Sequence, residues 1–349
     1  MAIRVAIISN SLTPYRIHLH QRIADECSDL ELWSLFTHEH SNAPWSLRAP
    51  AEIRPVFFGQ GEDSEKQGFA RRPLHEIRKA CRIEQQLRDI AVDIVILFGY
   101  NDWCRLHLIA WCRHRGIPCL MFGDSNPLGD GGLKALAKRA LLPPVLALCS
   151  GAMYCGSRGA EYFRRYGVPD EKLFPFPYEP DYLRVSTVSE TDCEVARRQF
   201  GLPSGRRRIL YCGRLAPVKR VDLLIAAFQT LAAERPNWDL VIAGDGTERI
   251  ALTALVGPAL RDRVHFLGFI KEANSVAAIY GLSDVLVLPS DYEPWGVVVT
   301  EGATRLALVC SSQVGAAPDL IEDHRNGLVF VAGDPTSLLS ALREVTDPL

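Results

Sequence analysis

Short apolar runs alternate with longer amphipathic stretches along most of this 349-residue chain. Runs rich in Val, Ile and Leu, each followed by a helical stretch, are typical of parallel strands joined by crossover helices. The runs are continuously apolar, as expected for strands buried on both faces. They fall into two series. The first predicts strands at 4–9, 30–36, 55–58, 93–98, 118–122 and 152–156, and the second at 208–212, 239–243, 264–267, 284–288, 308–311 and 328–331.

The pattern also predicts helices and a boundary between the two series. A helical stretch at 73–88 places Leu74, Ile77, Cys81 and Leu87 on one apolar stripe. Between residues 175 and 203 the chain becomes rich in Pro and then in Ser, Thr, Glu and Asp, which indicates a linker. We therefore expect an α/β protein of two Rossmann-like domains whose parallel sheets face each other across a cleft. The expected bounds are 1–183 for the first domain, 184–205 for the linker and 206–349 for the second domain.

Composition and charge exclude several classes of protein. Hydrophobic residues make up 48% and charged residues 23%, so neither a disordered nor a fibrous chain is indicated. The formal net charge of -2, with no basic excess in either half, argues against a nucleic-acid partner. No apolar run reaches the roughly 18 residues that span a bilayer, and we expect a cytoplasmic protein.

Metal binding is not expected. The ten cysteines lie mostly singly in apolar runs and form no Cys-x-x-Cys pair, which indicates buried thiols. His38, Glu39 and His40 alternate histidine and carboxylate, but adjacent residues suit a loop or a strand end better than a closed metal site. We therefore predict that the protein holds no metal and no cofactor.

The first junction with candidate chemistry follows the predicted strand 208–212. In open parallel sheets, ligands bind beyond the carboxyl ends of the strands. There Gly213, Arg214 and Lys219 precede a helix that starts near residue 220. A helix N-terminus attracts anions, and nearby cations add charge-assisted hydrogen bonds, so this junction suits a diphosphate. A solvated loop with two surface cations explains the same residues.

The next two junctions carry weaker signals. Gly244 opens a Gly-Asp-Gly turn after the strand 239–243, where backbone could approach a ligand closely or the strand could simply end. Gly268, Phe269 and Ile270 follow the strand 264–267, and their backbone groups could contact a nucleotide base. A plain strand exit fits these residues equally well.

The fourth junction distinguishes the chain more clearly. After the strand 284–288 comes Pro-Ser-Asp-Tyr-Glu-Pro-Trp-Gly-Val-Val-Val-Thr-Glu, which places Glu293 and Glu301 eight positions apart, with a helix predicted to start near Gly296. Two carboxylates so placed can accept hydrogen bonds from the hydroxyl groups at different ends of one sugar-containing ligand. The competing interpretation is that Glu293 caps the helix and Glu301 is an exposed helical residue.

Together these junctions resemble the retaining GT-B glycosyltransferases of family 4, also called glycosyl transferases group 1, whose motif is two glutamates separated by seven residues. Gly-Arg-Leu at 213–215 with Lys219, Ala-Gly-Asp-Gly at 243–246, Val-x-Phe-Leu-Gly-Phe at 264–269, the glutamate pair and Asn-Gly-Leu-Val at 326–329 occur in the family's order. Tyr-Gly-Val-Pro-x-x-Lys at 166–172 and Phe-Pro-Tyr at 176–178 add to the match. The resemblance covers residues 152–331 well and the first 151 residues loosely.

The resemblance implies a role for each matching residue. Arg214 and Lys219 would hold the donor diphosphate and stabilise the leaving group, Glu301 would bind the ribose, and Glu293 would contact hydroxyls of the donor sugar. The backbone at Trp295, Gly296 and Val297 would complete the cradle. The family usually needs no metal, and two cations with a helix terminus can do the same electrostatic work.

The first domain departs from the family pattern. Residues 10–16 stand where the family carries a glycine-rich loop, and residues 99–102 stand where it often carries a histidine. Because the acceptor should lie at the carboxyl ends of the first series of strands, we expect the following residues to line that side: Asn10, Tyr15, Arg16, Asp124 and Ser125.

The expected function is a metal-independent, retaining hexosyltransferase of the kind used in polysaccharide biosynthesis, which moves a sugar from a nucleoside-diphosphate sugar to a glycan, lipid-linked or small-molecule acceptor. Since no carboxylate is placed as a nucleophile, we favour departure of the diphosphate and attack of the acceptor on the same face. Alternatives are a non-catalytic nucleotide-sugar-binding protein, a nucleotide-sugar epimerase, and a phosphorylase, whose pyridoxal-phosphate lysine we do not locate.

A peripheral contact with the inner face of the membrane is a further expectation. Residues 133–141 combine Lys134, Lys138 and Arg139 with leucines and alanines. Such a helix could rest its apolar side on an anionic bilayer, although it could also pack on the first sheet.

Overall fold

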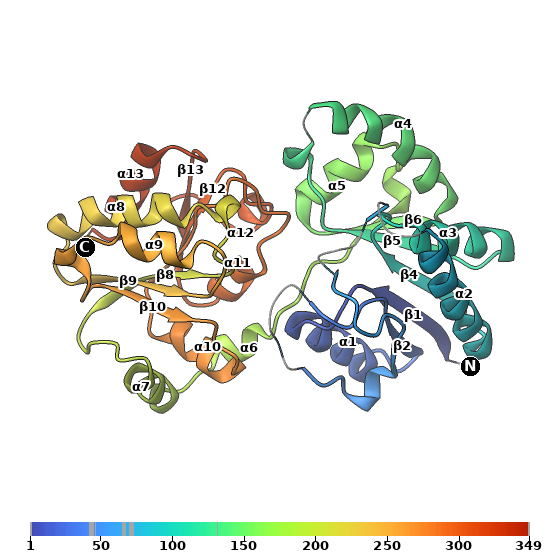
Figure 1. Cartoon of the computed structure of the whole chain (residues 1–349), viewed down its shortest axis with the longest axis horizontal. Coiled ribbons are helices and arrows are strands. Elements are labelled where there is room, and N and C mark those ends of the chain that lie inside the picture. Colours follow the sequence, from blue (N-terminus) through green and yellow to red (C-terminus); the bar gives the residue numbers. More distant parts are fainter. Residues whose placement is uncertain are drawn as a thin grey trace. The chain divides into compact units, whose positions relative to one another are not determined.

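The computed structural model describes residues 2–41, 45, 47–64, 68–69, 73–130 and 132–347, without the side chains of residues 132–134. The chain divides into two compact units, Met1–Pro180 and Asp181–Leu349. Each has a parallel sheet with helices packed on it (Figure 1).

The first unit is built on a seven-stranded sheet in the order β3-β2-β1-β4-β5-β6-β7, in which every neighbouring pair is parallel. The order reverses beside β1, so the carboxyl ends of β1 and β4 lie at a topological switch point. The strands are β1 (Ile3–Ser9), β2 (Leu30–Phe36), β3 (Pro55–Phe57), β4 (Ile94–Phe98), β5 (Cys119–Gly123), β6 (Gly151–Tyr154) and β7 (Leu173–Pro175).

Helices pack on this sheet and complete its core. They are α1 (Pro14–Glu26), α2 (Pro73–Ile90), α3 (Trp103–Arg115), α4 (Gly132–Leu148) and α5 (Gly156–Arg165), with short 3-10 turns η1 (Ala51–Ile53), η3 (Pro127–Gly129) and η4 (Asp170–Lys172). Ile8 of β1, Leu97 of β4 and Leu108 of α3 are fully buried in this core. Burying both faces of the sheet requires the continuous apolar runs seen in the sequence.

The second unit has a six-stranded parallel sheet in the order β10-β9-β8-β11-β12-β13. Its strands are β8 (Arg207–Cys212), β9 (Trp238–Ala243), β10 (Val264–Gly268), β11 (Val285–Leu288), β12 (Ala307–Ser311) and β13 (Gly327–Phe330). Its helices are α6 (Tyr182–Ser186), α7 (Glu190–Gln199), α8 (Val221–Glu234), α9 (Arg249–Leu255), α10 (Ala273–Gly281), α11 (Val297–Gly302), α12 (Ala317–Leu320) and α13 (Pro335–Val345), with η5 (Pro217–Lys219) and η6 (Pro258–Leu260). The order reverses beside β8, so the loops after β8 and β11 meet at a second switch point.

All twelve predicted strands are present to within one or two residues, and the structure adds β7. This strand has only three residues, one of them a proline, at the edge of the sheet. The strand ends at Pro175, where the Pro-rich stretch that indicated a linker begins, so the pattern did not reveal it.

The structure differs from the expected boundary between the domains. The segment 184–205, expected as a linker, contains most of α6 and all of α7, and both pack on α10 within the second unit. Asp181 and Ser189 cap these helices by accepting hydrogen bonds from the backbone N–H groups of Arg184 and Asp192. Ser, Thr and Asp favour helix N-caps as well as loops, so the composition was ambiguous.

The apolar stripe predicted for α2 is correct for Leu87, which is fully buried, and Ile77 is half-buried, but it is wrong for the other two residues. Leu74 is 74% exposed and Cys81 is also exposed, whereas the buried face runs through Glu76, Lys79 and Ile83. Two charged residues therefore occupy positions that hydrophobicity alone assigns to the surface. Their partners, described below, explain the burial.

Candidate functional site

The carboxyl ends of β8, β9 and β10 converge on two glycines of the second unit. The Gly213 N–H donates to the Ala243 carbonyl over 2.9 Å, and the Gly244 N–H donates to the Gly268 carbonyl over 2.9 Å. Gly244 has a φ of +146°, and a Cβ atom there would lie 1.8 Å from the Gly213 carbonyl oxygen. Only glycine fits, so the backbone is packed closely at this edge. Phe269 and Ile270 follow directly after β10 and are half-buried.

The loop between β8 and α8 carries the two predicted cations. Arg214 is exposed, and its carbonyl accepts a hydrogen bond of 2.8 Å from the Tyr211 hydroxyl. Lys219 ends η5, and its ammonium forms an ion pair with the Glu293 carboxylate. The two side chains are only 15% and 16% exposed, so this pair is partly withdrawn from water. Residues 74 positions apart in the sequence therefore meet at the switch point of the sheet.

The loop after β11 is held by backbone hydrogen bonds to the segment after β12. The Glu293 N–H donates to the Gln313 carbonyl over 3.1 Å, and the Glu293 carbonyl accepts from the Gly315 N–H over 3.0 Å. Gly296, with a φ of +94°, precedes α11. Glu293 therefore does not cap the helix, which removes one part of the competing interpretation. The Trp295 side chain is buried, so only its backbone can serve as the cradle expected from the sequence.

Glu301 lies in α11, and its environment differs from that of Glu293. The Tyr280 hydroxyl donates a hydrogen bond of 2.8 Å to its carboxylate. Burial raises the pKa of Glu301 from 4.5 to about 7, and the Tyr280 hydrogen bond only partly opposes this. Glu301 is therefore not an exposed helical residue. One glutamate is paired with a lysine, while the other accepts a hydrogen bond from a tyrosine and has a raised pKa.

Three of the residues expected on the acceptor side gather at the carboxyl edge of the first sheet. The Tyr178 hydroxyl donates to Asp124 over 3.2 Å, and the rings of Tyr178 and Tyr15 meet edge to face with centroids 4.9 Å apart. The Arg16 guanidinium lies over the Phe98 ring, 5.6 Å from its centroid, and donates to the Ser11 carbonyl over 2.6 Å. Burial raises the pKa of Asp124, while Tyr178 and Arg16 oppose the rise.

Asn10 and Ser125 have other partners. Asn10 accepts a hydrogen bond from the buried Arg105, which also donates to the Phe98 carbonyl over 2.6 Å and pairs with Asp102. Ser125 bonds to the Tyr162 hydroxyl. The structure thus places the five predicted residues at one edge of the sheet but in three separate groups of contacts.

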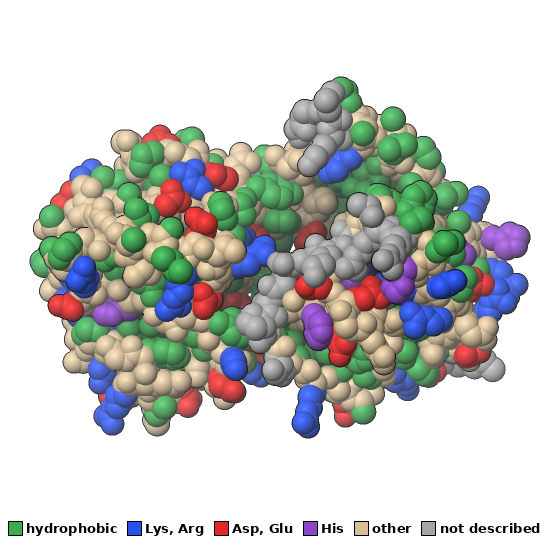
Figure 2. All heavy atoms as spheres, in the orientation of Figure 1, with side chains coloured by type: hydrophobic (Ala, Val, Ile, Leu, Met, Phe, Trp, Pro, Cys, Tyr) green, Lys and Arg blue, Asp and Glu red, His purple; other side chains and the backbone are tan. Residues whose placement is uncertain are grey.

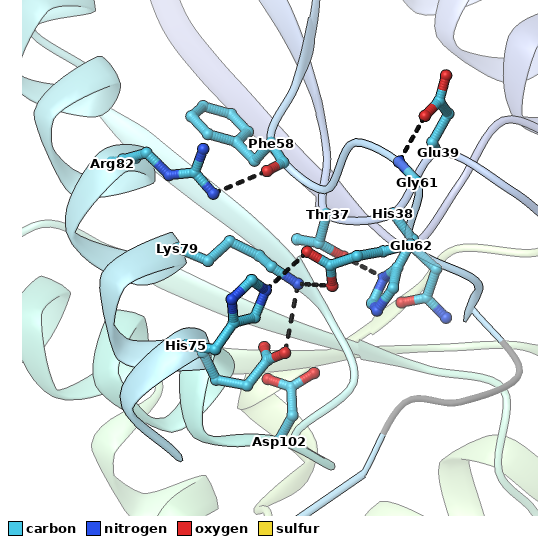
Figure 3. A network of polar contacts seen from close by, with 12 residues as sticks. Thr37, His38, Glu39, Phe58, Gly61, Glu62, His75, Lys79, Arg82 and Asp102 are labelled. Atoms are coloured by element: carbon cyan, nitrogen blue, oxygen red, sulfur yellow. Dashed lines mark hydrogen bonds and ion pairs between the residues drawn. The ribbon is translucent and has the colours of Figure 1, made fainter. Parts of the chain in front are cut away.

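A buried polar network adjoins this edge (Figure 3). The Lys79 ammonium donates to Glu62 over 2.5 Å and to Glu76 over 3.4 Å, and His75 contacts the other oxygen of Glu62 over 2.9 Å. Burial, with Lys79 as the nearest cation, lowers the pKa of His38 to about 4. The charges are paired as buried charges must be. Sequence reasoning missed this network because Glu62 and Lys79 lie 17 positions apart with no motif between them.

Two groups of side chains in the described part of the chain have the spacing of metal ligands: Glu62, His75 and Glu76, and Glu76, Asp102 and Cys104. Lys79 already supplies a positive charge to both Glu62 and Glu76. His38, Glu39 and His40 do not form such a group; His38 contacts the Thr37 hydroxyl and Glu39 accepts from the Gly61 N–H. We assign no metal site to these residues.

Two α/β units, each built on a parallel sheet, indicate the GT-B fold, and solved structures agree. HepE of Anabaena, in complex with UDP and glucose, superimposes with a TM-score of 0.73 and 17% identity over 98% of this chain and 89% of that one. Sucrose-phosphate synthase from Thermosynechococcus elongatus gives a TM-score of 0.74 and 19% identity, with 98% of this chain and 89% of that chain covered. At these identities the likeness shows the fold.

Sequence comparison finds matches to the second unit. Residues 192–347 match the model of the glycosyl transferases group 1. An uncharacterized glycosyltransferase of Methanocaldococcus jannaschii is 36% identical over 143 residues, which is 41% of this chain and 36% of the relative. The alpha-D-kanosaminyltransferase of Streptomyces kanamyceticus is 32% identical over 192 residues, or 54% and 48% of the two chains. The matched region thus spans half or less of these curated relatives.

The structure was also searched for helices that could span a membrane. Among the residues that the structure describes, no helix combines the length and the apolar character needed to cross a bilayer.

Proposed function

We propose that this protein transfers a sugar from a nucleoside-diphosphate sugar to an acceptor, with retention of configuration at the anomeric carbon. The observation that carries the proposal is the arrangement after β8 and β11. Lys219 and Glu293 meet there, and Glu301 of the same unit is half-buried and accepts a hydrogen bond from Tyr280. The donor has a diphosphate, a ribose and a sugar. The cation suits the diphosphate, and the two carboxylates, which lie in different environments, suit the hydroxyl groups of the ribose and of the sugar.

Each residue is proposed to act on one part of the donor. Arg214 and Lys219 bind the diphosphate, because positively charged donors form strong hydrogen bonds to phosphate oxygens. Gly213 and Gly244 let the backbone approach it. Glu301 accepts hydrogen bonds from the ribose hydroxyls, which compensate its burial.

The remaining groups of the site are proposed to contact the sugar and the base. Glu293 accepts hydrogen bonds from hydroxyls of the donor sugar once Lys219 engages the phosphate. The backbone of Trp295, Gly296 and Val297 adds N–H donors near the phosphate and the sugar. Phe269 and Ile270 contact the base.

In the proposed reaction, the bond from the anomeric carbon to the diphosphate breaks as the acceptor hydroxyl attacks the same face. The acceptor proton passes to the departing phosphate oxygen, so no protein nucleophile is required. Arg214 and Lys219 stabilise the negative charge that develops on the leaving group. Because these cations supply the electrostatic stabilisation, we propose that the reaction proceeds without a metal.

The acceptor, a glycan, a lipid-linked sugar or a small molecule, is proposed to bind at the carboxyl edge of the first sheet. Asp124 and Asn10 offer polar contacts to hydroxyl groups, and Tyr15 offers an aromatic ring. Tyr178, which the sequence analysis did not assign, orients Asp124 through its hydroxyl and packs against Tyr15.

Helix α4 is proposed to contact a membrane. Its buried residues include Leu142 and Leu146, whereas Leu136 and Leu141 are 60% and 70% exposed. Figure 2 shows apolar side chains over this part of the first unit. Arg139 is exposed beside them, and such a face binds anionic lipid through buried apolar area and charge.

A labelled-donor assay tests the proposed reaction. UDP-, GDP- and ADP-sugars are incubated with the protein and a set of glycan and lipid-linked acceptors, and the product and its anomeric configuration are determined. Glu293→Ala should lower turnover by more than about a hundredfold with the fold intact, the scale for removing one positioned polar contact. Binding without transfer or hydrolysis for every donor would favour a non-catalytic nucleotide-sugar-binding protein. Conversion of the donor sugar without an acceptor would favour an epimerase.

A further inference from the structure

The donor loops of the second unit are joined beside the proposed catalytic pair. The Asp291 N–H, in the loop after β11, donates to the Val218 carbonyl, in the loop after β8, over 2.9 Å. The Arg220 guanidinium reaches both oxygens of Asp291, over 3.1 and 3.2 Å. Arg220 directly follows Lys219, and Asp291 lies two residues before Glu293. The ion pair thus bridges the same two loops as the Lys219–Glu293 pair.

Arg220 has an unusual backbone conformation. Its φ and ψ are +50° and +41°, in the left-handed region, where a residue with a Cβ atom is strained and glycine is not. Such strain persists where the surrounding contacts require it, and it is concentrated at functional sites. Besides Asp291, the guanidinium contacts Asp222 at 3.2 to 3.4 Å, so its direction is fixed on both sides.

The Lys219–Glu293 pair cannot by itself hold the loops when a donor is bound. In the proposed reaction Lys219 turns to the diphosphate and Glu293 to the sugar, so their mutual attraction is shared with the ligand. The Arg220–Asp291 pair is not proposed to contact the donor. It is more exposed, with 27% and 44% of the two side chains accessible, and it can remain formed in both states.

We propose that Arg220 and Asp291 are positioning residues that keep the Lys219 loop and the Glu293 loop at a fixed separation in the empty and the donor-loaded site. This inference rests on the proposed function, because it assumes that the donor binds between these loops. It explains why a strained arginine occupies a position that glycine would fill without strain. An isolated surface ion pair would contribute little to stability and nothing to donor affinity.

Two substitutions separate a positioning role from a structural one. Arg220→Gly removes the ion pair but also relieves the backbone strain, so the melting temperature should stay unchanged or rise. Asp291→Asn removes the charge and keeps the shape and the backbone N–H. Both should weaken binding of a nucleoside diphosphate by about fivefold or more, within the range of coupling between neighbouring residues. The double variant should lose no more than the stronger single variant.

Two matched variants serve as controls. Asp222→Asn removes the negative charge that Arg220 meets in the first turn of α8 and leaves the bridge to Asp291. Glu234→Gln breaks an exposed ion pair with Arg343 at the far end of α8. Both should bind nucleoside diphosphate within about twofold of the parent protein, since neither joins the two loops.

The experiment is calorimetry of the full chain with UDP, GDP and ADP, using whichever binds most tightly, together with thermal unfolding. The inference is overturned if Arg220→Gly and Asp291→Asn bind like the controls, or if their losses multiply in the double variant. If no nucleoside diphosphate binds the parent protein, the proposed function fails and the positioning role fails with it. If the parent binds and Arg220→Gly and Asp291→Asn bind as tightly as the parent, the proposed function stands and this inference alone is rejected.

Discussion

Replacing Glu301 by glutamine should stabilise the protein and weaken donor binding at the same time. Glu301 is half-buried and its carboxylate receives a hydrogen bond of 2.8 Å from Tyr280, and desolvation raises its pKa from 4.5 to about 7. Glutamine keeps an oxygen that can accept the Tyr280 hydrogen bond, and it never carries a charge. The substitution therefore removes the cost of burying an ionised group while preserving the shape of the site.

The magnitude follows from the two pKa values. Between pH 4.5 and about 7 the folded protein holds a proton on Glu301 that the unfolded chain has lost. The free energy of unfolding therefore falls as pH rises through this interval and is constant above it. A difference between 4.5 and about 7, at about 1.4 kcal/mol for each pH unit, corresponds to roughly 3 to 4 kcal/mol. Glu301→Gln should recover up to about that amount at pH 8 and almost none at pH 4.5.

Denaturant unfolding of both proteins across this pH range measures the difference directly. Calorimetry at pH 8 should show weaker binding of nucleoside diphosphate to the variant, because an amide oxygen is a poorer acceptor for ribose hydroxyls than a carboxylate. For the parent protein, binding should weaken as the pH falls below about 7, where Glu301 takes up its proton. If the stability difference does not change with pH, Glu301 is solvated like an ordinary glutamate and the reasoning fails.

Three further predictions concern charge and surface. Glu293→Gln should abolish transfer yet raise nucleoside-diphosphate affinity, because Lys219 is released from its ion pair; calorimetry that shows weaker binding would contradict this. Arg214→Ala and Lys219→Ala should each weaken that binding by about 1.5 to 3 kcal/mol, the value of hydrogen bonds to charged groups, and EDTA should leave it unchanged. Abolition by EDTA would show that a metal holds the phosphate. Replacing Leu136 and Leu141 by serine should lower sedimentation with anionic vesicles in low salt, without changing the melting temperature, and equal sedimentation would remove the membrane contact.

The sequence by itself determined the architecture and the position of the donor junctions. Strands buried on both faces must be continuously apolar, so the runs located twelve strands in two sheets, and the carboxyl ends followed from chain direction. Glu293 and Glu301 were found because a strand, a turn and a helix start lie within thirteen residues of one another. The succession of strand, turn and helix within a short segment can be predicted from the sequence alone. The edge strand β7 runs into a Pro-rich stretch that indicates a linker, and a Ser- and Asp-rich segment serves helix caps and loops alike.

Only the tertiary structure decided which distant groups meet and which charges are buried. From the sequence alone, Lys79 is expected on the surface of an amphipathic helix. In the structure it is buried because it forms ion pairs with Glu62 and Glu76. The pairs between the loops after β8 and β11 join residues more than 70 positions apart, because the order of strands brings those two loops together. The raised pKa of Glu301 likewise depends on the residues that exclude water from α11. Sequence spacing sets local geometry, whereas pairing and desolvation depend on how the strands are ordered in space.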